Sequence, residues 1–359
     1  MKNLLFVLYL LSWVQIPVIK AQTGQLKFFG DTRIRLEFDR DAQKPNGEWY
    51  PDRDRLRFRF RFGIKYYYNN FEMGGRIRTG NAENPQSSNI TFGDKFQTDH
   101  INLDKAYIKY NYKGFNIWIG KNQMNMWMPD DMLWDTDVNP EGIALHQKFW
   151  VRNQNFNFNA GFFLLSHNKT EQNKQTFDRQ ANIGFVQLKW SLQRYRHKLI
   201  IAPAMMWAHT TPVFSPDYKI FSNYIKYRYG SFQFHFDYFI NFENLKHKVL
   251  SAYENEKNAY VFAVQYSYKK SPALSVGYAH IEKYAIIDRF AQDNWVRWSE
   301  TNYTRSSNFK GWEIGLKHKI SKNIETQIKY WTVKGLQKTD WQKTFETGKR
   351  LRWDMKIKF

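Results

Sequence analysis

The chain ends on Leu351-Arg352-Trp353-Asp354-Met355-Lys356-Ile357-Lys358-Phe359, in which apolar and charged side chains alternate at every position. Strict period-two alternation predicts a β-strand with one apolar face and one charged face. A strand that ends on an aromatic carboxy-terminus is typical of bacterial outer-membrane barrels, whose last strand closes against the first. A soluble edge strand can alternate in the same way, so the segment by itself leaves both structures open.

The composition favours the membrane structure. Aromatic residues make up 18% of the 359 residues and hydrophobic residues 42%, yet the mean hydropathy of the chain is negative. A barrel reconciles these values, because half of each strand faces lipid and the other half faces water. Open sheet edges cannot be left in hydrocarbon, so the strands of such a protein must close on themselves.

The amino-terminal residues have the pattern of a secretory signal peptide. Lys2 supplies the positive start, residues 4–18 are mostly apolar, and Ala21 suits the last position before cleavage. We therefore expect a signal peptide over residues 1–21 and an outer-membrane β-barrel domain over residues 22–359. The sequence contains no cysteine, which excludes a lipid-anchored lipoprotein and any disulfide framework. Export without cysteines suits the outer membrane of a Gram-negative bacterium.

The chain is strongly basic, with a formal net charge of +21. In a soluble protein this charge would suggest nucleic-acid binding. Here the lysines and arginines are spread along strands at alternate positions, with no basic helix and no zinc-finger spacing. We predict a positively charged lumen and no nucleic-acid partner.

The remaining sequence divides into alternating segments that predict an all-β fold, a transmembrane antiparallel β-barrel of about 16 strands. The connections between them alternate strictly between short and long, as expected for short periplasmic turns opposite long extracellular loops. The predicted strands are 25–38, 55–68, 71–79, 101–112, 115–121, 142–151, 155–166, 180–191, 197–209, 219–229, 232–242, 258–269, 273–284, 309–319, 323–335 and 347–359.

Arginines alternate with apolar residues along the first three predicted strands. An arginine facing lipid would cost about 2–4 kcal/mol near the midplane, so these side chains should point into the barrel. One interpretation is a ladder that draws anions through the pore. The other is that the arginines pair with acids such as Asp31, Glu37 and Glu72 and fill the interior. The predicted pore-lining residues are Arg33, Arg35, Arg55, Arg57, Arg59, Arg61, Arg76 and Arg78.

The third long loop, residues 122–141, is rich in methionine, tryptophan and aspartate. So many apolar side chains would be unusual in water, so we expect this loop to fold into the barrel and narrow it. Its carboxylates would then face the arginines and set up a transverse field. The predicted constriction residues are Met126, Trp127, Asp130, Asp131, Trp134, Asp135, Asp137 and Glu141.

Part of this loop also offers oxygen ligands for calcium. Asp135, Asp137 and Asn139 alternate as ligands do in calcium loops, but the glycine and distant glutamate of an EF-hand are missing. Turn hydrogen bonds and ion pairs with lumen arginines are the favoured interpretation. We predict no metal and no cofactor.

Several segments together resemble the putative porin family of Bacteroidota: residues 52–59, 75–81, 91–94, 103–108 and 133–142. The resemblance covers roughly the first half of the chain after the signal, and the strand pattern continues to Phe359. It implies an outer-membrane β-barrel channel without naming a solute. A looser similarity to arginine-lined barrels such as alginate exporters points to anionic solutes.

Two other functional classes remain as alternatives. Enzymatic barrels use histidines near the outer rim, and His167, His209 and His280 are candidates, with Ser215 and Asp217 near His209. No nucleophile signature surrounds them, so we predict no enzyme.

The second alternative is a plugged or partner-binding barrel of an envelope assembly, with the aromatic loop 285–308 as docking surface. The favoured function is a porin for passive diffusion of small hydrophilic, anionic solutes, embedded in outer-membrane lipid, with monomer and homotrimer both open.

Overall fold

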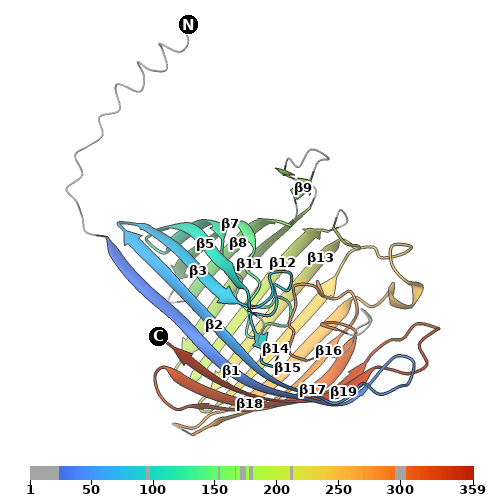
Figure 1. The fold of residues 1–359 in the computed structure, drawn as a ribbon. Helices are drawn as coiled ribbons and strands as arrows, with labels where there is room; N and C mark the ends of the chain where they lie inside the picture. The colour runs from blue at the N-terminus through green and yellow to red at the C-terminus, as the bar shows by residue number, and fades with distance from the viewer. Residues whose placement is uncertain are drawn as a thin grey trace, which may run out of the picture.

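Figure 1 shows a β-barrel whose first and last strands lie side by side, with the carboxy-terminus at the seam. Each barrel strand pairs antiparallel with two neighbours, and the ring of pairings closes over 16 strands. The expected signal peptide, residues 1–21, lies outside the described part of the chain. The computed structural model describes residues 24–93, 98–152, 154–165, 167–169, 175–177, 181–210, 213–269, 271–295 and 305–359.

The barrel strands follow one another around the ring in chain order. Their bounds are β1 (Gln25–Gln43), β2 (Arg53–Tyr68), β3 (Phe71–Thr79), β5 (Ile101–Tyr112), β6 (Phe115–Lys121), β7 (Glu141–Val151), β8 (Gln154–Leu164), β11 (Asn182–Arg194), β12 (His197–His209), β13 (Tyr218–Tyr229), β14 (Phe232–Asn241), β15 (Asn258–Tyr266), β16 (Ala273–Ile281), β17 (Phe309–Lys319), β18 (Ile324–Gly335) and β19 (Thr347–Lys358).

Three short strands and one short helix lie outside this ring. β4 (Ile90–Thr91) pairs with β2, and β9 (His167–Lys169) pairs with β10 (Gln175–Phe177) in a hairpin above the rim (Figure 1). The 3-10 helix η1 (Ser251–Tyr253) lies in the connection after β14. Within the described ranges, no helix is long and apolar enough to cross a membrane.

The predicted strand number and the predicted β-barrel are confirmed. Short and long connections alternate as expected, for example 69–70 and 113–114 against 80–100 and 122–140. The largest difference is in β1, which was predicted to end at residue 38 and continues to Gln43. Its charged end looks like a loop in the sequence, but ion pairs to β19 continue the ladder there.

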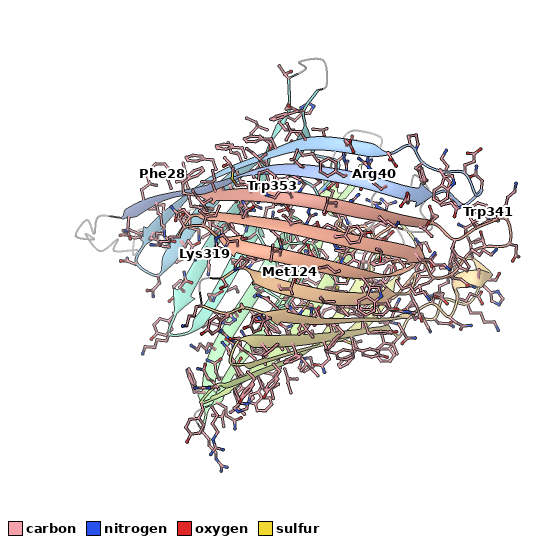
Figure 2. All side chains as sticks on the ribbon, turned by 90° about the horizontal axis from the view of Figure 1, so that it is seen from below. Phe28, Arg40, Met124, Lys319, Trp341 and Trp353 are labelled. Carbon is pink, nitrogen blue, oxygen red and sulfur yellow. The ribbon has the colours of Figure 1, made fainter. Side chains whose placement is uncertain are left out.

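The two faces of each strand have opposite chemistry, as the alternation requires. On β2, Leu56 and Ile64 point outward and are each 40% exposed, whereas the inward Arg59 is 3% exposed. Figure 2 shows side chains projecting from both faces of the strands around the barrel. An outward row of this composition suits contact with lipid, because hydrocarbon accepts apolar side chains and rejects guanidinium groups.

The seam between β1 and β19 combines backbone and side-chain contacts. Gly30 and Phe359 exchange two backbone hydrogen bonds of 3.0 and 3.1 Å. A Cβ atom at Gly30 would overlap the Phe359 ring and the Arg61 carbonyl oxygen, so the close approach requires glycine. Further along the seam, Arg35 donates to the Asp354 carboxylate at 2.6 Å from the cross-strand position.

Placing an arginine on the outer face should destabilise the barrel. Ile34 lies near the middle of β1 and points outward. We expect Ile34→Arg to lower the free energy of unfolding by about 2–4 kcal/mol, and the rim variant Ile101→Arg by about 0–1 kcal/mol. Reversible denaturant unfolding in lipid vesicles measures both. Equal costs for the two variants would contradict the placement of Ile34 in hydrocarbon.

Candidate functional site

The interior face of β1, β2 and β3 places arginines directly opposite one another. Arg33 faces Arg59 and Arg35 faces Arg57 across the β1–β2 ladder. Like charges at directly opposite positions repel, so this register is destabilising unless anions lie between the side chains. The predicted inward direction of the arginines agrees with the alternation along each strand. We call this surface the arginine wall; it consists of the eight predicted arginines with Arg350 and Arg352 of β19.

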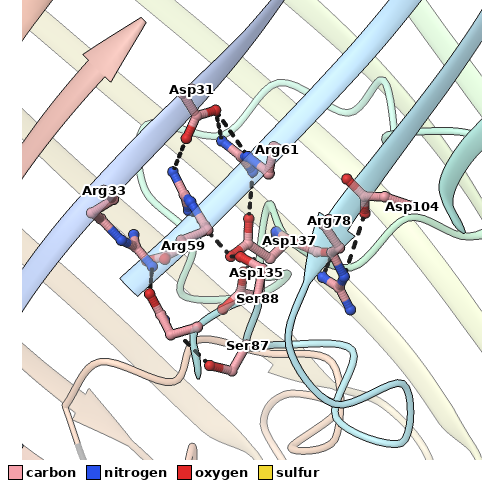
Figure 3. A network of polar contacts seen from close by, with 12 residues as sticks. Asp31, Arg33, Arg59, Arg61, Arg78, Ser87, Ser88, Asp104, Asp135 and Asp137 are labelled. Atoms are coloured by element: carbon pink, nitrogen blue, oxygen red, sulfur yellow. Dashed lines mark hydrogen bonds and ion pairs between the residues drawn. The ribbon is translucent and has the colours of Figure 1, made fainter. Parts of the chain in front are cut away.

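Carboxylates lie between the arginines and are shared by them. Asp31 accepts from Arg59 at 2.6 Å and from Arg61 at 2.7 Å (Figure 3). The same sharing occurs at five further carboxylates, each of which contacts at least two arginines. The six are Asp31, Glu37, Asp39, Asp104, Asp137 and Asp354. The ten arginines of the wall therefore outnumber the six carboxylates that they share.

The third long connection, residues 122–140, is called L3 here, and Asp137 links it to the arginine wall. One Asp137 carboxylate oxygen lies 2.8 Å from Arg61 and the other 3.5 Å from Arg59 (Figure 3). The Ser88 hydroxyl donates to the same carboxylate at 3.0 Å. Burial alone would raise the pKa of Asp137, but the two guanidinium groups hold it well below its usual range. Asp137 therefore anchors L3 as a carboxylate.

The apolar side chains of L3 are buried inside the barrel. Met126 is 5% exposed and Trp134 is 2% exposed. The Trp134 ring packs against Phe290, with ring centroids 5.1 Å apart. Trp127 exchanges two hydrogen bonds with the Gln187 side chain on β11, at 2.7 and 2.8 Å. These contacts explain the many methionines and tryptophans of L3, whose side chains would otherwise lie in water.

The other predicted L3 carboxylates lie away from the arginines. Asp130 is 3.4 Å from His235, and Asp131 accepts from Asn294 at 3.0 Å. Burial, together with Asp130, raises the pKa of Asp131 to about 6. In the described part of the chain, Asp137 alone among the predicted L3 carboxylates pairs with these arginines. The expected row of opposed acids is thus reduced to one residue, because Asp130 contacts His235 of β14 and Asp131 contacts Asn294 instead.

Asp135 and Glu141 complete the set. Burial and the charge of Asp293 raise the pKa of Asp135 well above its usual range. Glu141 is the first residue of β7 and pairs with Lys121 at 2.7 Å. The Glu141 side chain is 65% exposed. It therefore lies outside the narrow part of the interior.

The three oxygen-bearing residues considered for calcium have other partners. Asp135 accepts the backbone N–H of Asp137 at 2.7 Å, which is a turn contact. The Asn139 amide donates to Asp104 at 2.7 Å. The Asp137 carboxylate pairs with two arginines. These contacts agree with the interpretation that the three residues form turn hydrogen bonds and ion pairs.

A second loop that the sequence did not single out also enters the barrel. Residues 80–93, called L2 here, bring Ser87 to Arg57 at 3.1 Å and Asn89 to Arg33 at 2.7 Å. Together with L3, this loop covers much of the arginine wall, and Arg35 is 3% exposed and Arg78 is 7% exposed. Arg59 and Arg78 hold the loops in place through Asp137 and the Pro85 carbonyl, whereas Arg35 pairs with Asp354 of β19. L2 is rich in serine and asparagine, so its sequence lacks the apolar residues that would have predicted a loop folded into the barrel.

The opposite interior wall carries a row of lysines that sequence reasoning missed. Lys148 of β7 and Lys189 of β11 both lie beside Asn157 of β8 in the strand register. The charged groups that act on Lys189 are two further cations, Lys198 and Lys148. In the described residues, no carboxylate pairs with these lysines. We call Lys148, Lys189 and Lys198 the lysine row.

The lysine row lines a cavity of about 790 Å³ beneath L3. Trp127 forms part of its lining, and the Lys189 ammonium lies 5.6 Å from the centre of the Trp127 ring. Tyr195, at a short turn, lies at the other end. The cavity therefore extends from L3 toward the rim with the short turns. Its unpaired ammonium groups can bind anions that enter.

The candidate residues for catalysis do not form a recognisable triad. His209 lies 3.2 Å from Asp217, and its side chain is 60% exposed at the rim with the long connections. Asp217 also accepts the backbone N–H of Thr210 at 2.7 Å, so it orders the end of β12. The side chain of His167 is outside the described set, and His280 stacks on Tyr260 with ring centroids 5.0 Å apart. These contacts order strand ends and pack side chains, and they do not place a nucleophile beside either histidine.

The loop proposed as docking surface folds inward over its described part. Trp295 is 6% exposed and packs against Phe309, with ring centroids 5.6 Å apart. Backbone contacts to L3, such as the Asp135 N–H to the Phe290 carbonyl at 2.7 Å, hold it there. The described part of this loop therefore offers little exposed aromatic surface for a docking partner. Trp298 and Tyr303 lie outside the described residues.

A family model described as "Putative porin" matches residues 30–194. A sequence search of curated proteins found no match. The matched segment includes most of β1, the strands from β2 to β11, L2 and L3, and therefore most of the arginine wall.

Similar solved structures are outer-membrane barrels. Salmonella typhi OmpF in complex with daunomycin is 12% identical, with a TM-score of 0.57 and coverage of 94% of this chain and 98% of that chain. Pseudomonas putida OprB at high pH is 9% identical, with a TM-score of 0.59 and coverage of 93% and 94%. Vibrio cholerae OmpT in its trimer form is 10% identical, with a TM-score of 0.51 and coverage of 94% and 99%. At these identities the likeness establishes the fold.

Replacing Asp137 by asparagine should release L3 from the arginine wall. Removing one partner of a buried ion pair typically lowers the stability by about 3–5 kcal/mol. In this variant Arg59 and Arg61 would share only the Asp31 carboxylate. We expect a protease to cut faster within residues 122–140 of the folded barrel, and mass spectrometry of the fragments measures the rate. The control Asp52→Asn removes an exposed partner of Arg40 and should leave the rate unchanged. Equal rates for Asp137→Asn and wild type would contradict the anchor.

The same contact should make L3 sensitive to acid. The folded pKa of Asp137 lies below its unfolded value of about 3.9, so its stabilising contribution is complete above that pH. The contribution is lost as the pH falls from the unfolded toward the folded pKa. Cleavage of L3 by an acid-stable protease should therefore rise below a pH of about 4. The rise should be smaller in Asp137→Asn, and identical slopes would refute the assignment.

Proposed function

Because residues 30–194 belong to the putative porin family and the chain is an outer-membrane β-barrel, we propose that it is a porin for small hydrophilic anions. Solutes diffuse passively through the barrel interior, and the family and fold point to a channel rather than an enzyme. The observation that carries the anion preference is the excess of cations on both interior walls. No step of chemistry is required of the protein, since passage depends on size and charge.

The charge distribution supports this preference. On the arginine wall, carboxylates shared between arginines leave positive charge in excess, as with Asp31 between Arg59 and Arg61. On the other wall, the lysine row has no carboxylate partners among the described residues. A low-dielectric channel lined by one sign of charge concentrates the opposite ion and raises its rate of entry. The lysine row contributes most per residue, because its charges are not compensated.

L3 is the element that limits solute size in this proposal. It crosses the interior between the arginine wall, through Asp137, and β11, through Trp127 and Gln187. A segment fixed at both ends presents a constant obstacle to a passing solute. Its apolar side chains are used for packing, so the polar groups of the walls remain for the solute.

The runner-up function is a plugged or partner-binding barrel. Three inward loops contact one another, since L2 donates from Gln86 to the Ala291 carbonyl at 2.6 Å and L3 accepts from Asn294 at 3.0 Å. Loops that interlock in this way favour a closed interior. Purified wild-type barrel in a planar bilayer separates the two functions. Stable conducting steps support the porin, and insertion without conductance supports the plugged barrel.

The assembly that we expect in the membrane is a homotrimer. Vibrio cholerae OmpT was solved in a trimer form and shares the barrel architecture. The outward rows of this chain are apolar, and such surfaces can pack against lipid or against another copy. Chemical cross-linking in native membranes distinguishes a trimer from a monomer.

Neutralising the lysine row should weaken anion preference. We expect Lys189→Gln combined with Lys198→Gln to lower the anion-to-cation permeability ratio by about two-fold or more, because two uncompensated lumen charges are removed. The reversal potential in a salt gradient measures this ratio. The charge-matched control Lys246→Gln with Lys343→Gln alters exposed loop lysines and should leave it unchanged. Cation preference of the wild type would overturn the proposal.

Deleting residues 124–138 should widen the pore. We expect single-channel conductance to rise by about two-fold, because the segment occupies space between the walls. Should the deletion fail to fold, Trp127→Ala opens the cavity beneath L3 more gently and should give a smaller rise. Unchanged conductance in a folded deletion variant would show that L3 does not set the width.

A further inference from the structure

Three metal-ligating side chains converge where L3 meets β14. Asp130 comes from L3, and His235 and Asp237 come from the strand. One ligand atom from each of the three lies within 4.8 Å of the others. Among the described residues, no other group of three or more such side chains lies close enough together to hold one ion.

The strand geometry explains why the group forms. Residues two apart on a strand share a face, so His235 and Asp237 both point into the barrel. The register places Tyr224 of β13 beside Asp237 on one side and Val261 of β15 on the other. L3 then brings the Asp130 carboxylate to 3.4 Å from the His235 Nε2 atom. Two elements far apart in sequence therefore supply one ligand set.

Asp237 is buried, and the cation that acts on it, Lys226, is too far away to form an ion pair with it. The exposed fraction of Asp237 is 0%, and neither carboxylate oxygen has a hydrogen-bond donor among the described residues. The adjacent Tyr224 hydroxyl is also fully buried and unpartnered. An isolated buried carboxylate is strongly unfavourable, so it takes up a proton or binds a cation. Two carboxylate oxygens without a donor, next to the Asp130 carboxylate, indicate a missing positive partner.

The site has room for an ion and its water. A cavity of about 250 Å³ adjoins the group, with Asp130 and His235 in its lining. Ala263 lies beside His235 in the register, and its small side chain leaves space above the imidazole. A cavity of this size holds several waters, which can complete a coordination shell.

We propose that Asp130, His235 and Asp237 bind one divalent transition-metal ion that fastens L3 to β14. One imidazole nitrogen and two carboxylate oxygens form a mixed ligand set that suits Zn²⁺ and Mn²⁺ better than Ca²⁺, which takes oxygen ligands. The ion neutralises Asp237 and gives His235 Nε2 a partner. It also gives L3 a further anchor, between the contacts of Trp127 and those of Asp137. The inference does not depend on anion passage.

A proton shared between Asp130 and Asp237 is the alternative state of this site. The two carboxyl groups are close enough to hydrogen-bond to each other when one is protonated. A shared proton would satisfy one oxygen of Asp237 without any metal. The two states differ in metal content, which can be measured directly.

The test uses the full barrel, refolded without a histidine tag, loaded with Zn²⁺ and freed of unbound metal. Mass-spectrometric metal analysis should find about one Zn²⁺ per chain in the wild type and much less in His235→Ala and in Asp237→Asn. The matched control His146→Ala alters another lumen histidine, which pairs with Asn159, and should retain the metal. A metal-free wild type, or full occupancy in both site variants, would overturn the proposal in favour of the shared proton.

A second readout ties the metal to L3. Zn²⁺ should slow proteolysis of residues 122–140 in the wild type and in His146→Ala, because a ligand that binds the closed loop stabilises it by mass action. It should have no effect in Asp237→Asn, which keeps the size of the side chain. Protection of L3 by Zn²⁺ in Asp237→Asn would show that the ion acts elsewhere and would reject this site.

Discussion

Arginines that face one another across adjacent strands can coexist in this barrel only because carboxylates lie between them. Arg33 opposes Arg59 and Arg35 opposes Arg57 in the ladder, and neither pair can turn outward, since lipid rejects a guanidinium group. The carboxylates come from the same strands, as with Asp31, and from a loop, as with Asp137. Repulsion between strand arginines thus creates the binding site for L3. The seam of the barrel uses the same device, because Arg35 pairs with Asp354 of β19.

The two interior walls have different electrostatic roles. On the arginine wall, each guanidinium is tied to acids or to loop oxygens, and several are nearly inaccessible to solvent. Such charges stabilise structure and give a weak net field. The lysine row has no such partners among the described residues, and it borders the larger of the two cavities next to L3. Arginine content alone is therefore a poor guide to where an anion would bind, whereas uncompensated charge next to open volume is a better one.

L3 is held at separate points by contacts of different kinds. Asp137 binds guanidinium groups, Trp127 hydrogen-bonds with Gln187, and Asp130 meets His235. Because these contacts lie on different walls, L3 spans the interior instead of lining one side. Its aspartates consequently occupy unlike environments, which lower the pKa of Asp137 and raise that of Asp135. The residue type is the same, and the surroundings decide whether the group is an anion or an acid.

The sequence by itself determined the strands and their number, and it predicted that the arginines and L3 would lie inside the barrel. All of these follow from local patterns: period-two alternation sets the faces of a strand, and an apolar loop avoids water. It could not say which aspartate of L3 meets the arginines, that L2 also folds inward, or that Lys148 and Lys189 lie together. Those facts depend on strand register and on how loops fold back across the barrel. They bring together residues distant in sequence, such as Asp130 and Asp237, and only the tertiary structure decided them, because register and loop direction leave no periodic signal in the chain.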